Sequence, residues 1–181
     1  MKIVAFYAPY PGAGKSLAAR WVARRCRLFN IAFATPLRNA VYDIISYPVF
    51  HMVYPAFPPG QKEVVIPHLG VSWRDVMVAF GAAGRALRPD FWVRIMERRF
   101  QMQPYDYVID DPRFQEEYDF LRTAGARIIR IENPGREIVT TATEGRLEGN
   151  AFDAVIVNTK ENPRAYLRAV EATVRGLFHE T

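Results

Sequence analysis

Residues 9–16 combine glycines, a lysine and a serine at a spacing that suits phosphate chemistry, in the sequence PYPGAGKS. The end of this segment fits the pattern G-x-x-x-x-G-K-[ST], although Pro9 stands where its first glycine belongs. Glycines let backbone N–H groups converge on phosphate oxygens, a lysine reaches the outer phosphates of a nucleotide, and a serine hydroxyl can ligate Mg²⁺. Proline neither donates an N–H nor adopts a positive φ, so we expect an extended entry and assign the needed flexibility to Gly12. The segment predicts a loop that binds ATP with Mg²⁺.

The flanking residues favour a phosphate-binding loop over an ordinary glycine-rich turn before a helix. Lys2–Tyr7 is a short apolar run typical of a buried parallel strand. Gly14–Leu28 has helical spacing, with Leu17, Ala18, Trp21 and Val22 on one apolar stripe. A strand, a loop and a helix in succession place N–H groups and the positive end of the helix dipole at one point. The expected donor-site residues are Gly12, Ala13, Gly14, Lys15, Ser16, Leu17 and Arg136, with Ser16 as the metal ligand.

A second group of charged residues follows the apolar segment Tyr105–Ile109, which predicts a buried strand. Asp110, Asp111 and Arg113 would then lie at the carboxyl end of that strand, where ligands bind in open α/β sheets. A carboxylate there could hold Mg²⁺ or its water shell, and an arginine could contact a phosphate through two parallel hydrogen bonds. A structural interpretation stays open beside this one, because an aspartate before Pro112 is also typical of a helix N-cap.

The segment Phe80–Arg94 combines arginines with aromatic residues. A nucleoside monophosphate site needs cations for the phosphate and an apolar face for the base, which makes Arg85 and Trp92 candidates. Plain core packing is the competing interpretation of Trp92.

Strands that alternate with helices predict an α/β fold, with a parallel, doubly wound sheet and helices on both faces. We expect a core of about residues 1–45 and 105–181, and an inserted helical substrate-binding subdomain of about residues 46–104. Within that insertion, Tyr47–Leu69 holds five prolines and predicts a loop or flap. The expected strands are Lys2–Tyr7, Asn30–Ala34, Tyr105–Ile109, Ala126–Glu132 and Ala154–Val157. The expected helices are Gly14–Leu28, Leu37–Ile45, one N-capped by Ser72 and running to Leu87, Pro89–Phe100 with Pro89 at its first position, Phe114–Thr123 and Pro163–Phe178.

The composition limits the possible partners. A formal charge of +5 over 181 residues favours anionic partners, either nucleic acid or phosphorylated metabolites. Nucleic acid is the less favoured of the two, because we find no helix-turn-helix, zinc or base-stacking signature. The most membrane-like stretch, Ala40–Pro59, contains Asp43 and several prolines, so no membrane helix is expected. With Cys26 as the single cysteine no internal disulfide can form, which fits a cytoplasmic protein.

Several motifs, in order, resemble those of the deoxynucleoside monophosphate kinases of bacteriophages. Besides the early loop, Phe33–Arg38 is similar to F-A-x-x-L-K and Val108–Glu117 to V-I-x-D-V-R-F-x-N-E. Further similarities are Gly84-Arg85 followed by Pro89-Asp90 and Trp92-Val93, Glu144 with Leu147 (S-E-x-x-L), and Asp153 with Val155–Asn158 (D-x-x-I-x-N). The resemblance spans most of the chain and implies the nucleoside-monophosphate-kinase-like P-loop fold.

This resemblance also implies a function, which is phosphoryl transfer from ATP, with Mg²⁺, to a deoxynucleoside monophosphate. It implies a homodimer and, for a phage-encoded protein, the host cytoplasm. By it, Lys15, Asp111 and Arg113 are catalytic, and the acceptor side is lined by Arg38, Arg85, Trp92, Asp110, Asp111, Arg113 and Glu116. Two alternatives stay open: another small-molecule P-loop kinase, such as one acting on a coenzyme precursor, or a non-catalytic nucleotide-binding protein that acts on DNA.

Asn133–Asn150 is polar and lies between two expected strands. Arg130, Arg136 and Arg146 lie within or beside it, together with glycines that could serve as hinges, Gly135, Gly145 and Gly149. We expect it to be a lid that orders over the donor phosphates and excludes water, with an exposed connector as the alternative.

Overall fold

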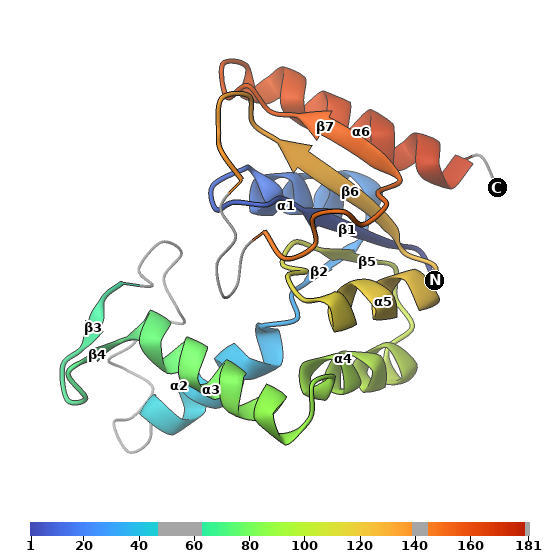
Figure 1. Cartoon of the computed structure of the whole chain (residues 1–181). Helices are drawn as coiled ribbons and strands as arrows, with labels where there is room; N and C mark the ends of the chain where they lie inside the picture. Colours follow the sequence, from blue (N-terminus) through green and yellow to red (C-terminus); the bar gives the residue numbers. More distant parts are fainter. Residues whose placement is uncertain (47–62, 139–144, 180–181) are drawn as a thin grey trace. The chain divides into compact units, whose positions relative to one another are not determined.

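Five parallel strands form the central sheet in this computed structural model, which describes residues 1–46, 63–138 and 145–179 (Figure 1). The sheet confirms the predicted parallel α/β fold. Its strands, in spatial order, are β2 (Phe29–Ile31), β5 (Tyr107–Ile109), β1 (Ile3–Tyr7), β6 (Arg127–Glu132) and β7 (Ala154–Val157).

Helices cover both faces of this sheet. On one face, α1 (Lys15–Cys26) and α6 (Pro163–His179) share an apolar core with the strands, in which Phe6, Val22 and Val170 are fully buried. On the other face, α5 (Gln115–Thr123) contributes Phe120, whose ring packs against Phe100 with 5.6 Å between centroids. This is the expected arrangement for a sheet of strands that are apolar on both sides.

The central strand β1 is buried along its whole length, which explains its continuous apolar sequence. It pairs with β5 on one side and β6 on the other, so the chain leaves β1 in one direction toward β2 and later crosses over to β6. Such a reversal of strand order leaves a crevice outside the carboxyl ends of the strands. The segment that follows β1 therefore emerges at the position where open α/β sheets bind ligands.

The chain divides into two compact units, of which the first holds the sheet (residues 1–33 and 96–181) and the second spans Ala34–Ile95. The second unit contains α2 (Thr35–Ser46), a hairpin of β3 (Val65–Ile66) and β4 (Val71–Ser72), α3 (Trp73–Leu87) and the start of α4 (Phe91–Met102). Its core is formed by Leu37, Val41, Ile45, Ile66 and Trp73. The unit therefore begins at Ala34 and includes α2, and the sequence did not predict the hairpin. Residues 47–62 of the proline-rich segment lie outside the described residues.

Of two predicted helix starts, the one at Ser72 is confirmed and the one at Pro89 is not. Ser72 caps α3 as predicted, since its hydroxyl accepts a hydrogen bond of 3.1 Å from the N–H of Asp75, whose carboxylate accepts the N–H of Ser72 in return. The prediction of Pro89 at the first position of a helix was wrong. The backbone N–H of Phe91 bonds the carbonyl of Arg88 at 3.1 Å, so Pro89 lies in a turn and α4 starts at Phe91.

The face of α1 was also partly mispredicted. Leu17 was expected on the apolar stripe, but its side chain is exposed. Ala18 and Val22 are buried as predicted, and Ala19 completes the buried face. Small alanines there allow α1 to approach the sheet closely.

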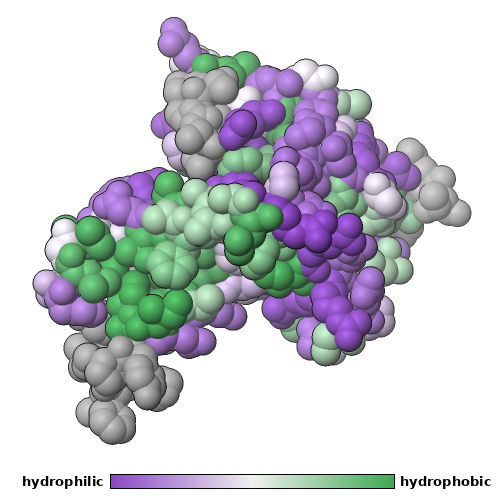
Figure 2. Space-filling view, turned by 60° about the horizontal axis from the view of Figure 1, so that its bottom comes forward, coloured by the Kyte–Doolittle hydropathy of each residue, from purple (hydrophilic) through white to green (hydrophobic). Residues whose placement is uncertain are grey.

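Apolar side chains are also exposed on the second unit, where Figure 2 shows them gathered into a continuous surface. Such surfaces are typical of contacts with a partner or a ligand. The exposed residues include Val64, Val65, Leu69, Val71, Val78 and Phe80. Among the described helices, none has the length and apolar character needed to cross a membrane.

Candidate phosphate-binding site

Two glycines with positive φ shape the loop between β1 and α1. Gly12 has φ 71°, and Gly14, the N-cap residue of α1, has φ 103°. Conformations of this kind favour glycine, and they fit the expectation that Gly12 supplies the flexibility that Pro9 lacks. Gly14 also needs its small size, because a methyl group there would lie 2.6 Å from Nδ2 of Asn158. The loop thus leads directly into a helix N-terminus, where backbone N–H groups and the helix dipole favour an anion.

Lys15, the first residue of α1, folds back over this loop. Its Nζ lies 3.4 Å from the carbonyl oxygen of Ala8 and 3.3 Å from that of Tyr10. The two carbonyls hold the ammonium group at the loop, where it can contact the phosphates of a nucleotide. The side chain of the next residue, Ser16, is exposed in the first turn of α1.

Arg136, one of the expected donor-site residues, provides a second cation at the loop. Its Nη1 donates a hydrogen bond of 3.0 Å to the carbonyl of Pro11, and its guanidinium lies 5.9 Å from the centre of the Tyr10 ring. It belongs to the segment expected to be a lid (residues 133–150), of which residues 139–144 lie outside the described residues. The remaining part of that segment contacts the sheet unit at both ends, through Asn133 and Glu148.

Buried polar residues form hydrogen bonds to the side of the loop that faces the protein interior, and the sequence did not predict these contacts. Nδ2 of Asn158 donates a hydrogen bond of 2.8 Å to the carbonyl of Ala13, and Oη of Tyr166 donates one of 3.2 Å to the carbonyl of Gly14. Tyr10 exchanges hydrogen bonds with the backbone N–H and carbonyl of Asn133. The loop is therefore fixed from below by residues that follow β6 and β7 and by one residue of α6.

The acidic residues after β5 lie at the same edge of the sheet as the loop, because Ile109 pairs with Ala5 of β1. Oδ1 of Asp111 accepts a hydrogen bond of 2.7 Å from the backbone N–H of Phe33. The alternative role of Asp111 as a helix N-cap is wrong, since α5 begins at Gln115 and its N-cap residue is Phe114. Asp111 instead connects the end of β5 to the segment after β2.

The N-terminus of α5 is capped by Glu117. Its Oε2 accepts hydrogen bonds from the backbone N–H groups of Arg113 at 2.7 Å and Phe114 at 3.2 Å. Burial, with a smaller contribution from the negative charge of Asp111, raises the pKa of this carboxyl group from 4.5 to about 8. Glu116, the acid expected in the site, is exposed to solvent. The buried acid that shapes the turn at Arg113 is thus the neighbour of the predicted one.

Arg113 itself is half-buried at this turn, beside Phe114. The guanidinium group of Arg146 lies 5.4 Å from the centre of the Phe114 ring. An arginine of the predicted lid segment therefore stands next to the strand end, while Arg136 stands at the loop. Both expected arginines are placed on the unit that holds the sheet.

Mg²⁺ prefers oxygen ligands and usually keeps several waters, so one or two protein oxygens suffice. The hydroxyl of Ser16 and the carboxylates of Asp110 and Asp111 supply such oxygens at one edge of the sheet, which fits this ion. Within the described ranges, no cluster of three or more histidine, cysteine or acidic residues forms a dedicated metal site.

The remaining predicted residues belong to the second unit. Nε1 of Trp92 donates a hydrogen bond of 3.0 Å to the carbonyl of Gly81, and the indole covers Gly84, where a methyl group would lie 2.8 Å from the ring. This contact favours the packing role of Trp92. Arg38 and Arg85 are half-buried on α2 and α3 respectively.

Comparison with known proteins gives a structural likeness without a sequence match. No family model and no curated protein matches the chain. A candidate kinase from Chloroflexus aurantiacus superposes with a TM-score of 0.54 at 12% identity, covering 99% of this chain and 96% of that chain. A dephospho-CoA kinase from Campylobacter jejuni gives a TM-score of 0.48 at 15% identity, covering 97% and 96% respectively.

At such low identity, the first of these likenesses establishes the fold alone. The chain shares the fold of that candidate kinase, a parallel α/β sheet, and its glycine-rich loop lies between β1 and α1. The resemblance to the bacteriophage deoxynucleoside monophosphate kinases stays a prediction.

Proposed function

We propose that this protein is an ATP-dependent kinase that transfers the γ-phosphoryl group to a deoxynucleoside monophosphate. The observation that carries the proposal is the loop before α1, where Gly12 and Gly14 adopt positive φ and Lys15 folds back over the loop. An anion at this point meets the N-terminus of α1 and the cations Lys15 and Arg136. The triphosphate of ATP matches that set of groups.

In the proposed reaction, the protein contributes by positioning the substrates and neutralising their charge. In phosphoryl transfer, negative charge is spread over the oxygens of the transferred group, and fixed cations and N–H groups stabilise it. Lys15 and Arg136 are the proposed donor-side cations. Mg²⁺, held through Ser16 and a carboxylate after β5, would supply further neutralisation. No covalent intermediate with the protein is needed.

The proposed acceptor residues at the end of β5 are Asp110, Asp111 and Arg113. Arg113 would bind the monophosphate, because a guanidinium group offers two parallel donors to phosphate oxygens. Its backbone is fixed by Glu117, so the side chain starts from a defined position. Asp111 is the proposed acceptor-side acid. The family resemblance adds Glu116 to this group.

The resemblance also assigns Arg38, Arg85 and Trp92 of the second unit to the acceptor, and we keep the two arginines as proposed phosphate contacts. Trp92 is the weakest of the three, because its indole N–H and ring are already used against α3.

A coupled assay of ATP consumption across the deoxynucleoside and ribonucleoside monophosphates tests the proposal. We expect turnover that depends on the monophosphate and is fastest with one or more deoxynucleotides. Turnover with a coenzyme precursor such as dephospho-CoA, and with no nucleotide acceptor, would indicate a different small-molecule kinase. Salt-dependent DNA binding without any monophosphate turnover would indicate a non-catalytic protein that acts on DNA.

A further inference from the structure

Five carbonyl groups in or beside the phosphate loop face donors that the protein itself provides. Those of Ala8 and Tyr10 face Lys15, and that of Pro11 faces Arg136. The amide of Asn158 bonds the carbonyl of Ala13 from the buried side. The carbonyl of Gly14 accepts two hydrogen bonds, one of 2.9 Å from the backbone N–H of Ala18 in the first turn of α1 and one from the hydroxyl of Tyr166.

The two lower donors are themselves held rigidly. The side chains of Asn158 and Tyr166 are 6% and 5% exposed. Asn158 makes four hydrogen bonds with residues that the structure describes. Its backbone N–H donates to the carbonyl of Glu132 at 2.7 Å, its carbonyl accepts from the side-chain amide of Asn133, its Oδ1 accepts from the N–H of Lys160 at 3.1 Å, and its Nδ2 donates to the carbonyl of Ala13. Asn158 therefore has little freedom to follow the loop if the loop moves, and it acts as a fixed support.

Peptide geometry links these carbonyls to the phosphate-binding face. A trans peptide is planar, so the carbonyl of Ala13 and the N–H of Gly14 point in opposite directions, as do the carbonyl of Gly14 and the N–H of Lys15. Holding the two carbonyls toward the buried side therefore directs the two N–H groups away from it. A carbonyl turned the other way would present a negative dipole to an anion.

We propose that Asn158 and Tyr166 are positioning residues, which bind the carbonyls of Ala13 and Gly14 so that the following N–H groups face the donor phosphates. This inference rests on the proposed ATP site and names residues that support it without contacting the nucleotide. Burial raises the pKa of the Tyr166 phenol, so its hydroxyl stays a donor throughout the neutral range. Gly14 completes the arrangement, because any side chain there would displace Asn158.

The test compares ATP binding, measured by calorimetry with Mg²⁺ and without an acceptor, in Tyr166→Phe, Asn158→Asp and wild-type protein. Tyr166→Phe removes one hydroxyl, and we expect it to weaken ATP binding by about 5- to 10-fold, as the loss of one hydrogen bond would. Asn158→Asp replaces the donor by an oxygen that repels the carbonyl of Ala13, and we expect a loss of about 100-fold or more.

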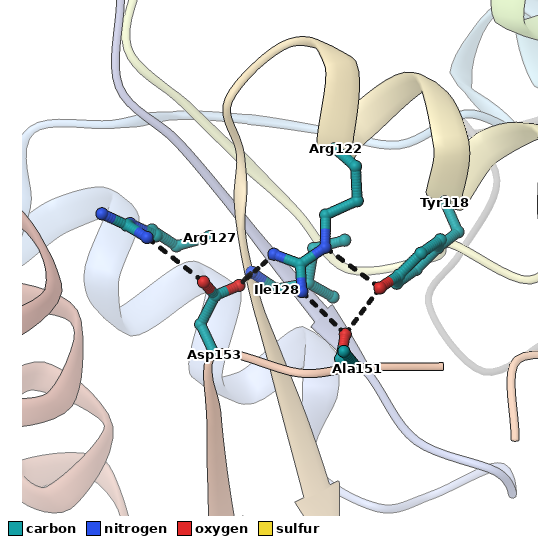
Figure 3. Close-up of polar contacts among 6 residues, drawn as sticks. All are labelled: Tyr118, Arg122, Arg127, Ile128, Ala151 and Asp153. Carbon is teal, nitrogen blue, oxygen red and sulfur yellow. Dashed lines mark hydrogen bonds and ion pairs between the residues drawn. The ribbon is translucent and has the colours of Figure 1, made fainter. Parts of the chain in front are cut away.

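Tyr118→Phe is the matched control. Tyr118 is also buried in the sheet unit, and its hydroxyl donates a hydrogen bond of 2.7 Å to a carbonyl, that of Ala151, away from the loop (Figure 3). This hydroxyl also accepts a hydrogen bond of 3.0 Å from Nε of Arg122, so we expect Tyr118→Phe to lower the melting temperature at least as much as Tyr166→Phe, while ATP binds as in the wild type.

Two outcomes would overturn the inference. If Tyr166→Phe and Asn158→Asp lose stability but bind ATP like the wild type, the two residues serve folding only. If Asn158→Asp fails to fold, unchanged binding by Tyr166→Phe still decides against the proposal. Wild-type protein that does not bind ATP would instead contradict the proposed function itself, and the two failures are therefore distinguishable.

Discussion

Glu117, buried in the first turn of α5, accepts a hydrogen bond of 2.7 Å from the backbone N–H of Arg113, four residues earlier. The proposed phosphate-binding arginine is therefore held by a carboxyl group whose own pKa is raised to about 8, mainly by burial and secondarily by Asp111. Two properties of the protein, its stability and its handling of the acceptor, should depend on this pair.

The ionisation of Glu117 should make the folded protein less stable as pH rises. The folded protein keeps this carboxyl protonated up to about pH 8, whereas the unfolded chain releases the proton near 4.5. The contribution of Glu117 to the free energy of unfolding is therefore fully present below pH 4.5 and is lost as pH rises through about 8. Chemical denaturation across this range should show a decline on the order of a few kcal/mol in the wild type.

Glu117→Gln should flatten this decline, because glutamine keeps an acceptor for the two N–H groups and cannot ionise. The exposed neighbour provides the control: Glu116→Gln should retain the pH dependence of the wild type. An equally steep decline in Glu117→Gln would show that this carboxyl is not the group responsible.

Arg113→Ala should impair use of the monophosphate far more than it impairs folding. Loss of a bidentate phosphate contact is expected to lower kcat/KM for the acceptor about 100-fold or more. Arg113→Lys, which keeps the charge but not the paired donors, should recover part of that loss. A large drop in melting temperature with unchanged kinetics would instead make Arg113 a structural residue.

Gly14→Ala should destabilise the protein and weaken ATP binding. The substitution meets two obstacles, a φ of 103° and the amide of Asn158 at 2.6 Å. Gly125→Ala is the control that meets the first obstacle alone, because Gly125 has φ 73° but an added methyl group there would have no atom within 4 Å. Backbone strain alone should cost Gly125→Ala roughly 1–2 kcal/mol in the free energy of unfolding. If Gly14→Ala and Gly125→Ala lower the free energy of unfolding equally, the contact with Asn158 does not contribute to the effect at Gly14.

Two helical glycines should respond to alanine in opposite directions. At Gly84 in α3, a methyl group would lie 2.8 Å from the Trp92 ring, so Gly84→Ala should destabilise by about 1–3 kcal/mol. At Gly176 in α6 nothing lies within 4 Å, so Gly176→Ala should stabilise by up to about 1 kcal/mol through helix propensity. Thermal unfolding measures both, and a neutral Gly84→Ala would mean that Trp92 is free to move away.

Features that depend on neighbouring residues could be predicted from the sequence. Local signals mark the apolar run of β1, the glycines before α1 and the N-cap residue Ser72, and the structure has all three. The parallel sheet followed from the alternation of such elements. By contrast, a proline near a helix start is compatible with both a first helical residue and a turn, which is why Pro89 was misplaced.

Features that depend on distant contacts could not be predicted. Adjacent residues on a helix differ by about 100° around its axis, so only the packing of α5 decides that Glu117 is buried while Glu116 is exposed. Asn158 and Tyr166 contact residues 145 and 152 positions away in the loop. Asn158 ends the segment that is similar to D-x-x-I-x-N, and Tyr166 resembles an ordinary helix residue, but neither signal indicates a contact with the phosphate loop.

The most direct test of the central claim follows the γ-phosphoryl group of labelled ATP into deoxynucleoside monophosphates, with wild-type protein and Lys15→Ala compared at equal folded concentration. The proposal predicts labelled deoxynucleoside diphosphate with the wild type. It predicts a rate with Lys15→Ala that is lower by about 1000-fold or more, because a cation that neutralises the transferred group has been removed. Label transferred equally well by folded Lys15→Ala, or no transfer to any monophosphate by the wild type, would contradict it.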